Sequence, residues 1–125
     1  MRQYGSEPKK SLDFPRIVNK RNTLRLAELL QDTHVIFGGD IIEDECYIAP
    51  TLVDEPSLNS PLMQEEIFGP ILPILVYKTD EDIENIIWNA DTPLALYVFS
   101  NKKSFIEKTI NKFSFGGGVV NDLLI

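Results

Sequence analysis

The chain has 125 residues, of which 43% are hydrophobic and 25% are charged, and its formal net charge is −7. These values are ordinary for one soluble globular domain. The negative charge argues against a nucleic-acid partner or an anionic membrane surface, because both need clustered lysine and arginine. One cysteine and one histidine allow no internal disulfide and predict no metal site, and apolar runs are too short to span a membrane. A reducing, cytoplasmic location is the expectation, and a membrane anchor after Ile125 in the intact protein is the open alternative.

The first half of the chain predicts one helix followed by short extended segments. Prolines and glycines make residues 1–14 irregular, and apolar spacing predicts a helix over 16–31 with Pro15 in its first turn. The apolar run 34–37 ends at two glycines and predicts a strand and a turn. The remaining segments are an exposed acidic stretch (40–45), two extended segments (47–49 and 51–53) and a loop (54–63). Pro50, between the extended segments, predicts an edge or irregular strand.

The second half alternates strands and helices. Thr79 and Asp82 form a predicted capping box at the start of a helix, and Trp88 in that helix is expected to serve packing. The predicted elements are a strand over 71–77, this helix from about 79 to 90, a buried strand over 94–99, a helix starting near 100 and a strand starting at 119. The order βαβαβ implies an α/β fold with a parallel sheet and right-handed crossovers.

The chain ends on the apolar residues 123–125. An independent domain seldom stops on an apolar strand with no polar tail, so we expect the chain to be a fragment of a larger protein.

Residues 64–70 (Gln-Glu-Glu-Ile-Phe-Gly-Pro) form a predicted loop that turns into the strand at Ile71. The Gly-Pro pair punctuates the chain strongly, and proline fixes φ while removing a donor. Two interpretations are open. The loop is either a surface turn with two solvated acids, or it presents one carboxylate and one aromatic ring to a ligand at the edge of a sheet.

Other candidate residues have simpler explanations. The glycines 116–118 follow a helix and precede a strand, which is the reverse of a phosphate-binding turn, so they predict close backbone packing. Cys46 follows three acids, which disfavour a thiolate, and His34 lies twelve residues away with no sign that the two meet. Both are interpreted as ordinary residues.

The loop and several collinear segments resemble the aldehyde dehydrogenase superfamily, and specifically its class 3 or fatty aldehyde branch. The resemblance covers almost the whole chain, through residues 4–5, 9–11, 16–18, 47–52, 63–74, 93–100 and 117–122. It implies a three-layer α/β fold with a mostly parallel sheet, as part of the family's catalytic domain.

The resemblance also implies a cofactor and site residues. In the family, the second glutamate of the motif accepts hydrogen bonds from the nicotinamide ribose of NAD or NADP, and the phenylalanine packs near the ring. Those positions are Glu66 and Phe68 here, while Glu65 receives no role. Asn121 lies in a segment that approaches the substrate pocket in the family. No catalytic residue is expected in this chain, because the family's nucleophilic cysteine lies in a motif that the chain lacks.

Residues 1–125 are thus expected to be a partial catalytic domain. The Rossmann-like cofactor domain, the nucleophile segment and the C-terminal oligomerisation segment are expected to lie outside it. The parent enzyme would oxidise a long-chain or aromatic aldehyde to a carboxylic acid through a cysteine thiohemiacetal, and it would act as a homodimer. The isolated chain of 125 residues is expected to be inactive. The alternatives are a related oxidoreductase, such as a semialdehyde dehydrogenase, and a non-catalytic remnant or binding module.

Overall fold

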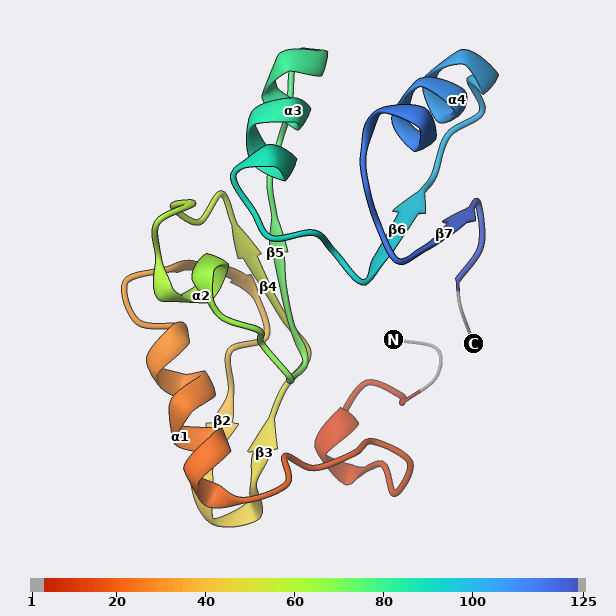
Figure 1. The fold of residues 1–125 in the computed structure, drawn as a ribbon. Helices are drawn as coiled ribbons and strands as arrows, with labels where there is room; N and C mark the ends of the chain where they lie inside the picture. The colour runs from red at the N-terminus through yellow and green to blue at the C-terminus, as the bar shows by residue number, and fades with distance from the viewer. Residues whose placement is uncertain (1–3, 124–125) are drawn as a thin grey trace. The chain divides into compact units, whose positions relative to one another are not determined.

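The structure is a computed structural model that describes residues 4–123. Its contacts divide the chain into two compact units, Met1–Val76 and Tyr77–Ile125, which are described separately here. Helices and strands are mixed in both units, so the predicted α/β class is confirmed (Figure 1). The apolar residues 124 and 125, predicted to end the last strand, lie outside the described part. Within residues 4–123, no helix is both long enough and apolar enough to cross a membrane.

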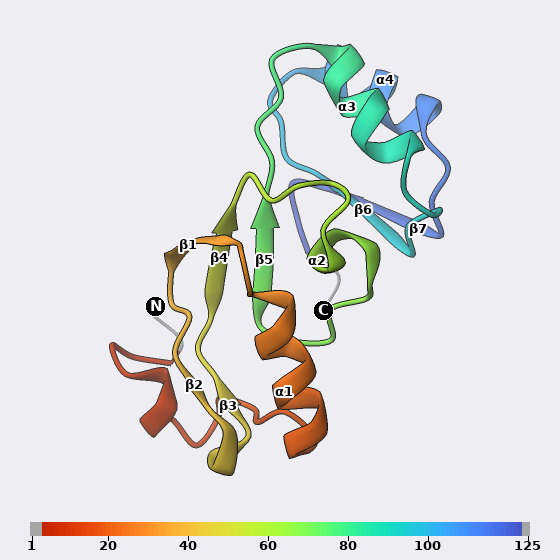
Figure 2. The same cartoon turned by 90° about the vertical axis from the view of Figure 1, so that its left-hand side faces the viewer.

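The first unit is built on a mixed three-stranded sheet with β4 in the centre (Figure 2). Strand β1 pairs with β4 in the antiparallel sense and β5 pairs with β4 in the parallel sense, while β2 and β3 form a separate antiparallel ribbon. The elements of this unit are η1 (Pro8–Lys10), α1 (Lys20–Leu29), β1 (His34–Phe37), β2 (Ile41–Ile42), η2 (Glu43–Glu45), β3 (Tyr47–Ile48), β4 (Thr51–Asp54), α2 (Pro61–Gln64) and β5 (Ile71–Ile74).

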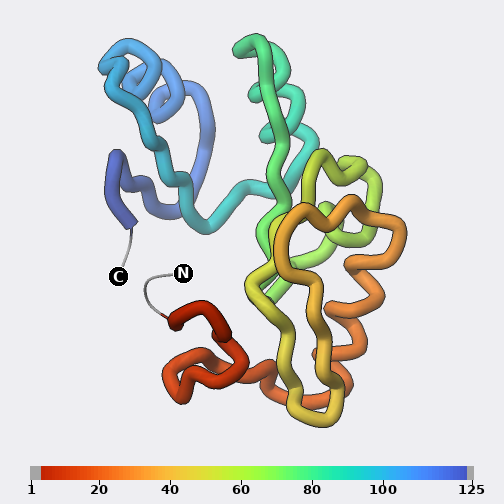
Figure 3. The backbone as a smooth tube through the Cα atoms, turned by 180° about the vertical axis from the view of Figure 1, so that it is seen from behind, coloured from red at the N-terminus to blue at the C-terminus, as the bar shows by residue number. Residues whose placement is uncertain are grey.

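Helix α1 begins four residues later than the apolar spacing predicts. Asn19 is its N-cap, and the side-chain oxygen of Asn19 accepts a hydrogen bond from the Asn22 backbone N–H at 2.8 Å. Pro15 therefore lies outside the helix. The segment before the cap is tied to η2 instead, since the Ile17 N–H donates to the Cys46 carbonyl at 2.8 Å. Figure 3 follows this part of the backbone, where an ion pair from Lys20 to Asp44 joins the start of α1 to η2 at 2.8 Å.

The edge-strand prediction based on Pro50 is wrong for the strand that follows it. Pro50 lies just before β4, outside the hydrogen-bonded ladder, so its missing donor costs nothing there. The neighbouring Thr51 N–H donates to the Pro70 carbonyl at 2.8 Å, next to the first residue of β5. A proline immediately before a strand is thus compatible with a central position.

The core of the first unit joins both helices to the sheet. Six buried apolar side chains form it: Leu26, Leu29, Ile48, Val53, Leu62 and Ile71. Burying one such side chain contributes about 1.5–3 kcal/mol. The core therefore fixes α1, α2 and the start of β5 relative to one another, and the residues 64–70 run between the last two.

The second unit contains α3 (Asp80–Trp88), β6 (Ala95–Val98), α4 (Lys103–Lys112) and β7 (Gly117–Val120). Strands β6 and β7 are parallel and α4 connects them, as the sequence predicts. The order β5–α3–β6–α4–β7 is confirmed, while the four strand pairings in the described part are divided equally between parallel and antiparallel. Parallel pairing joins β4 to β5 and β6 to β7, as the predicted α/β fold with parallel strands requires, and the antiparallel pairs are β1 with β4 and β2 with β3.

Burial of β6 is lower than its composition predicts. Within β6, Val98 is buried but Tyr97 is 39% exposed, and the flanking Leu94 and Phe99 are 84% and 62% exposed.

Of the three glycines after α4, Gly116 behaves as predicted, because a Cβ there would lie 2.7 Å from the Leu94 carbonyl oxygen. A Cβ on Gly117 would meet nothing within 4 Å, and one on Gly118 would meet the Phe115 side chain rather than backbone. The close backbone approach of the two strands therefore depends on Gly116.

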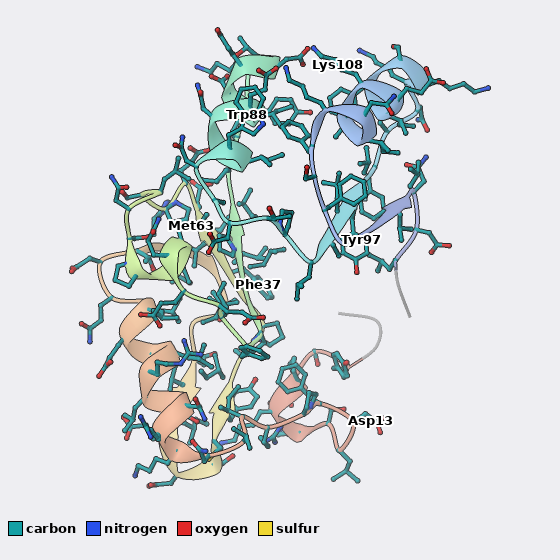
Figure 4. The ribbon with its side chains drawn as sticks, viewed as in Figure 1. Asp13, Phe37, Met63, Trp88, Tyr97 and Lys108 are labelled. Carbon is teal, nitrogen blue, oxygen red and sulfur yellow. The ribbon has the colours of Figure 1, made fainter. Side chains whose placement is uncertain are left out.

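Helices α3 and α4 are joined by polar and aromatic contacts (Figure 4). Lys108 pairs with Asp80 at 2.5 Å, and Lys112 pairs with Glu84. The ring of Trp88 packs edge-on against Phe113 with centroids 6.4 Å apart, which agrees with the packing role expected for it. These contacts fasten one face of α3 to α4.

Candidate functional site

The loop over residues 65–70 connects α2 to β5 in the first unit. Its entry is anchored at Gln64, whose side-chain amide donates to the Leu58 carbonyl at 2.7 Å. Its exit is anchored by the bond from Thr51 to Pro70. Between these anchors the chain leaves regular structure, so the loop presents its side chains at the edge of the sheet.

Phe68 is the aromatic residue of this loop, and its ring is exposed. Its side chain is 78% exposed and its backbone has φ +48°, in the left-handed region. This conformation is unfavourable for a residue with a Cβ and is found where the surroundings enforce it. Gly69 follows, and a Cβ there would lie 2.6 Å from Cδ1 of the buried Leu26 on α1. The small residue lets the loop lie directly against the helix.

The two glutamates of the loop have different surroundings. The Glu65 carboxylate pairs with the Arg25 guanidinium, with Oε2 3.3 Å from Nη1. Glu66 uses its backbone carbonyl towards the same arginine, at 3.4 Å, while its side chain is exposed. Within residues 4–123, the Glu66 carboxylate makes neither a hydrogen bond nor an ion pair. The loop therefore offers one carboxylate that is already neutralised and one that is open to a ligand.

An open cavity of about 870 Å³ lies beside this loop. One wall is formed by the loop, through Glu65, Glu66 and residues 68–70, and the other by Tyr4 and residues 14–18 together with Asn22 and Arg25 of α1. A volume of this order is typical of small-molecule sites. The wall combines apolar and aromatic side chains with a few charged ones, so it suits a ligand with a planar apolar part and a polar part.

An aromatic cluster supports the second wall. The buried Phe14 packs edge-on against Tyr4, with ring centroids 5.1 Å apart, and against Tyr47, with centroids 5.8 Å apart. The Arg16 guanidinium lies 5.0 Å from the Tyr47 ring centroid and donates to the Phe14 carbonyl at 3.0 Å. Residues 1–14 are predicted to be irregular, yet Tyr4 and Phe14 at the ends of this segment pack into an ordered cluster with Tyr47.

Asn121, the third candidate residue, belongs to the second unit. Its side-chain amide bonds to both backbone groups of Ser100: Oδ1 accepts from the N–H at 2.8 Å and Nδ2 donates to the carbonyl at 3.0 Å. Its backbone is left-handed, with φ +54°, and its N–H donates to the Val98 carbonyl at 2.9 Å. The residue thus ties the end of β7 to the end of β6. Glu66 and Phe68 are brought together by the structure, whereas Asn121 lies in the other unit.

Cys46 and His34 occupy separate structural positions. Cys46 closes η2 with φ +48°, and His34 lies on β1 with Nδ1 3.5 Å from the Asp54 carboxylate. Across the described residues, no group of three or more His, Cys, Asp and Glu side chains is arranged to hold a metal ion.

Comparison with known proteins gives the same family throughout. The Aldehyde dehydrogenase family matches residues 4–125. A 4,4'-diaponeurosporen-aldehyde dehydrogenase of Staphylococcus aureus is 45% identical over 124 residues, which are 98% of this chain and 27% of that protein. Aldehyde dehydrogenase family 3 member A2 of Rattus norvegicus is 43% identical over 122 residues, covering 98% of this chain and 25% of that protein. The "dimeric NADP-preferring" aldehyde dehydrogenase of Bos taurus is 42% identical over the same share of this chain and 51% of its own length.

Solved structures agree with these relatives. A substrate-bound aldehyde dehydrogenase of Staphylococcus aureus superposes with a TM-score of 0.90 at 46% identity, over 97% of this chain and 27% of that one. An NAD+ complex of the Bacillus cereus enzyme shares the fold, with a TM-score of 0.80 at 22% identity, over 93% of this chain and 25% of that one. The chain spans about a quarter of the length of the first two curated relatives. With a family match over nearly all of its length, the chain belongs to the aldehyde dehydrogenase family.

Proposed function

We propose that the loop at 65–70 binds the nicotinamide ribose end of NAD+ or NADP+ in an enzyme that oxidises an aldehyde to a carboxylic acid. The observation that carries this proposal is the difference between the two acids. Both glutamates line the cavity, but the Glu65 carboxylate is paired with Arg25, whereas the Glu66 carboxylate has no protein partner among residues 4–123 and lies in the same lining as the exposed ring of Phe68. Solved structures of relatives in complex with NAD+ support the choice of ligand.

The residues at the loop fit the two parts of such a ligand. A carboxylate accepts several hydrogen bonds at once, so Glu66 can hold both hydroxyls of a ribose. The Phe68 ring offers an apolar surface to a neighbouring planar ring. When bound, the nicotinamide accepts the hydride that leaves the aldehyde carbon. The role of this loop is then to hold the acceptor ring in one orientation at close range, which is a positioning contribution to the rate.

The reactive thiol is proposed to come from outside residues 1–125. Cys46 follows three acidic residues, and its carbonyl is engaged with the Ile17 N–H. The family's nucleophilic cysteine lies in a motif that residues 1–125 lack, and Cys46 is not in that context. The chain therefore contributes the cofactor side of the site, and the part of the protein that holds the thiol contributes the other side.

The substrate is proposed to be a long-chain or aromatic aldehyde, by similarity to the family 3 relatives. A panel of long-chain, aromatic and semialdehyde substrates, assayed with the full-length protein, separates this proposal from a semialdehyde dehydrogenase. A homodimer is also proposed, since one relative is named dimeric. Sedimentation of the full-length protein tests it.

The direct test of the site is Glu66→Gln in the full-length protein that carries this chain. The loss of charge should slow hydride transfer by at least about tenfold, because a hydrogen bond to a charged group is worth ~1.5–3 kcal/mol. The measurement is the pre-steady-state formation of NAD(P)H.

Glu65→Gln is the matched control, one residue away in the same loop. It weakens only an exposed ion pair, so hydride transfer should stay within about threefold of the parent. An unchanged rate in Glu66→Gln would contradict the proposed site.

A further inference from the structure

Arg25 lies on a rigid face of α1. The next residue, Leu26, is fully buried in the core, and the nearby Thr23 is also fully buried, with its hydroxyl donating to the Asn19 carbonyl at 3.1 Å. The Arg25 side chain itself is 31% exposed, so it lies partly beneath the loop. Its guanidinium therefore extends from a well-fixed position on the helix.

The guanidinium contacts three successive residues of the loop. Nη1 donates to the Glu65 carboxylate at 3.3 Å and to the Glu66 carbonyl at 3.4 Å. Nη2 donates to the Ile67 carbonyl at 2.7 Å, which is the shortest of the three contacts. Two of the three acceptors are backbone carbonyls, so most of these hydrogen bonds hold the main chain of the loop rather than a side chain. Arginine suits this task because its planar fork carries five N–H donors in fixed directions.

The loop residue that follows these contacts is the strained one. Phe68 has φ +48°, and the peptide groups before it are held by Arg25 through the carbonyls of Glu66 and Ile67. On the other side, Gly69 lies against Leu26. Two adjacent residues of α1 therefore hold the chain on both sides of Phe68. The surroundings enforce a conformation that Phe68 would otherwise avoid.

The same contacts determine how the side chains of Glu65 and Glu66 are oriented. Arg25 engages the side chain of Glu65 but only the backbone of Glu66, which leaves the Glu66 carboxylate exposed at the cavity wall. We propose that Arg25 is a positioning residue, which holds residues 65–68 in the shape that aims Glu66 and Phe68 at a bound nicotinamide nucleotide. This inference rests on the proposed function, since it assigns a support to the same site.

The test uses the full-length protein and five variants: Arg25→Met, Arg25→Lys, Glu65→Gln, Glu66→Gln and Arg21→Met. Arg21→Met is the matched control, because Arg21 lies on the same helix one turn earlier and is exposed. The measurements are the Kd for NAD(P)H by its fluorescence, the KM for the aldehyde, and the Tm.

Arg25→Met should raise the Kd for NAD(P)H by about tenfold or more, since it removes hydrogen bonds that carry a charge. Its aldehyde KM and its Tm should stay close to those of Arg21→Met, because the site is loosened while the fold remains. Arg25→Lys should recover part of the affinity, as a lysine reaches one carbonyl at a time. Glu65→Gln should change the Kd by no more than about threefold, because the carbonyl contacts remain.

Several results would overturn the inference. One is an Arg25→Met protein that binds NAD(P)H as tightly as Arg21→Met while Glu66→Gln binds weakly. Another is an Arg25→Met protein in which the Tm falls and the aldehyde KM rises together with the Kd, which indicates general damage. If Glu66→Gln itself binds NAD(P)H normally, the proposed function of the loop fails first, so the two failures are distinguishable.

Discussion

At the scale of single residues, the site depends on a difference between two neighbouring glutamates. Glu65 and Glu66 have the same side chain, and the structure separates them through Arg25, which lies 40 residues before Glu65 in the sequence. An exposed ion pair of this kind adds little stability, with typical values of about 0–1 kcal/mol. Its importance lies in which carboxylate it occupies, because Arg25 binds the side chain of Glu65 and only the backbone carbonyl of Glu66.

Gly69 carries a prediction at this scale. In Gly69→Ala, the new Cβ would lie 2.6 Å from Cδ1 of Leu26, which is fully buried. The helix side chain or the loop must move, and overpacking of this kind costs roughly 1–3 kcal/mol. We expect a lower free energy of unfolding in urea and weaker NAD(P)H binding by the full-length protein.

Gly117→Ala is the control, since a Cβ there meets nothing within 4 Å. If Gly69→Ala were as stable as Gly117→Ala and bound NAD(P)H normally, the close contact between the loop and α1 would contribute neither to stability nor to NAD(P)H binding.

At the scale of elements, α3 shows how local chemistry determines a helix start. The Thr79 hydroxyl accepts from the Asp82 N–H at 3.2 Å, and the Asp82 carboxylate accepts from the Thr79 and Lys78 N–H groups, each at 2.9 Å. The capping box predicted from the sequence is confirmed. It could be predicted because all its groups lie within five consecutive residues, so no distant packing is needed to form it.

This cap makes the stability of the second unit sensitive to acid. Hydrogen bonds from the Lys78 and Thr79 backbone hold the pKa of Asp82 below its ordinary value of 3.8. The hydrogen bond and charge of Lys108 likewise lower the pKa of Asp80. A depressed pKa means that the unfolded chain binds the proton more readily. The stabilisation is therefore present above about pH 4 and is lost as the pH falls through the folded-state pKa values.

We expect the Tm of the chain, measured by circular dichroism, to fall as the pH is lowered below 4. In Asp82→Asn this fall should be shallower, because one of the titrating carboxylates is gone, and the Tm near neutral pH should be lower than in the parent. Thr79→Ser keeps the hydroxyl cap and should follow the parent curve. A parallel acid dependence in Asp82→Asn and the parent would show that the cap contributes nothing to it.

The ion pair between Asp80 and Lys108 also predicts how the stability of the second unit changes at alkaline pH. The side-chain hydrogen bond to Asp80 raises the pKa of Lys108 above its ordinary value of 10.5. A raised pKa gives stabilisation that is complete below 10.5 and disappears as the pH rises through the folded-state value. The contact between α3 and α4 is thus expected to be most stable between these acid and alkaline limits.

At the scale of the whole molecule, the chain is much shorter than the first relatives that it matches. It belongs to the aldehyde dehydrogenase family but spans about a quarter of the first two curated relatives. We expect purified residues 1–125, mixed with NAD(P)+ and a long-chain or aromatic aldehyde, to form no NAD(P)H, because the proposed thiol lies elsewhere. Steady formation of NAD(P)H, absent from a Cys46→Ser control, would contradict this expectation and make Cys46 the nucleophile.

The sequence by itself determined the features that depend on near neighbours. Apolar spacing identified the order β5–α3–β6–α4–β7, glycine placement indicated the close backbone packing at Gly116, and the motif at 64–70 led to the family. These inferences needed only interactions within a few residues or a linear match. Helix α1 shows the limit even here, since apolar spacing continued through residues 16–19 while the cap at Asn19 set the true start.

Only the tertiary structure decided which strand is central and which acid is open. Pro50 indicated an edge, yet β4 pairs on both sides, because the ladder begins one residue after the proline. Arg25 selects Glu65 over Glu66 through contacts across 40 residues, and the wall around Phe14 forms by packing with Tyr4 and Tyr47. The physical reason is common to all three: pairing between distant groups depends on how the elements pack in space, and neither hydrophobic period nor motif spacing records that arrangement.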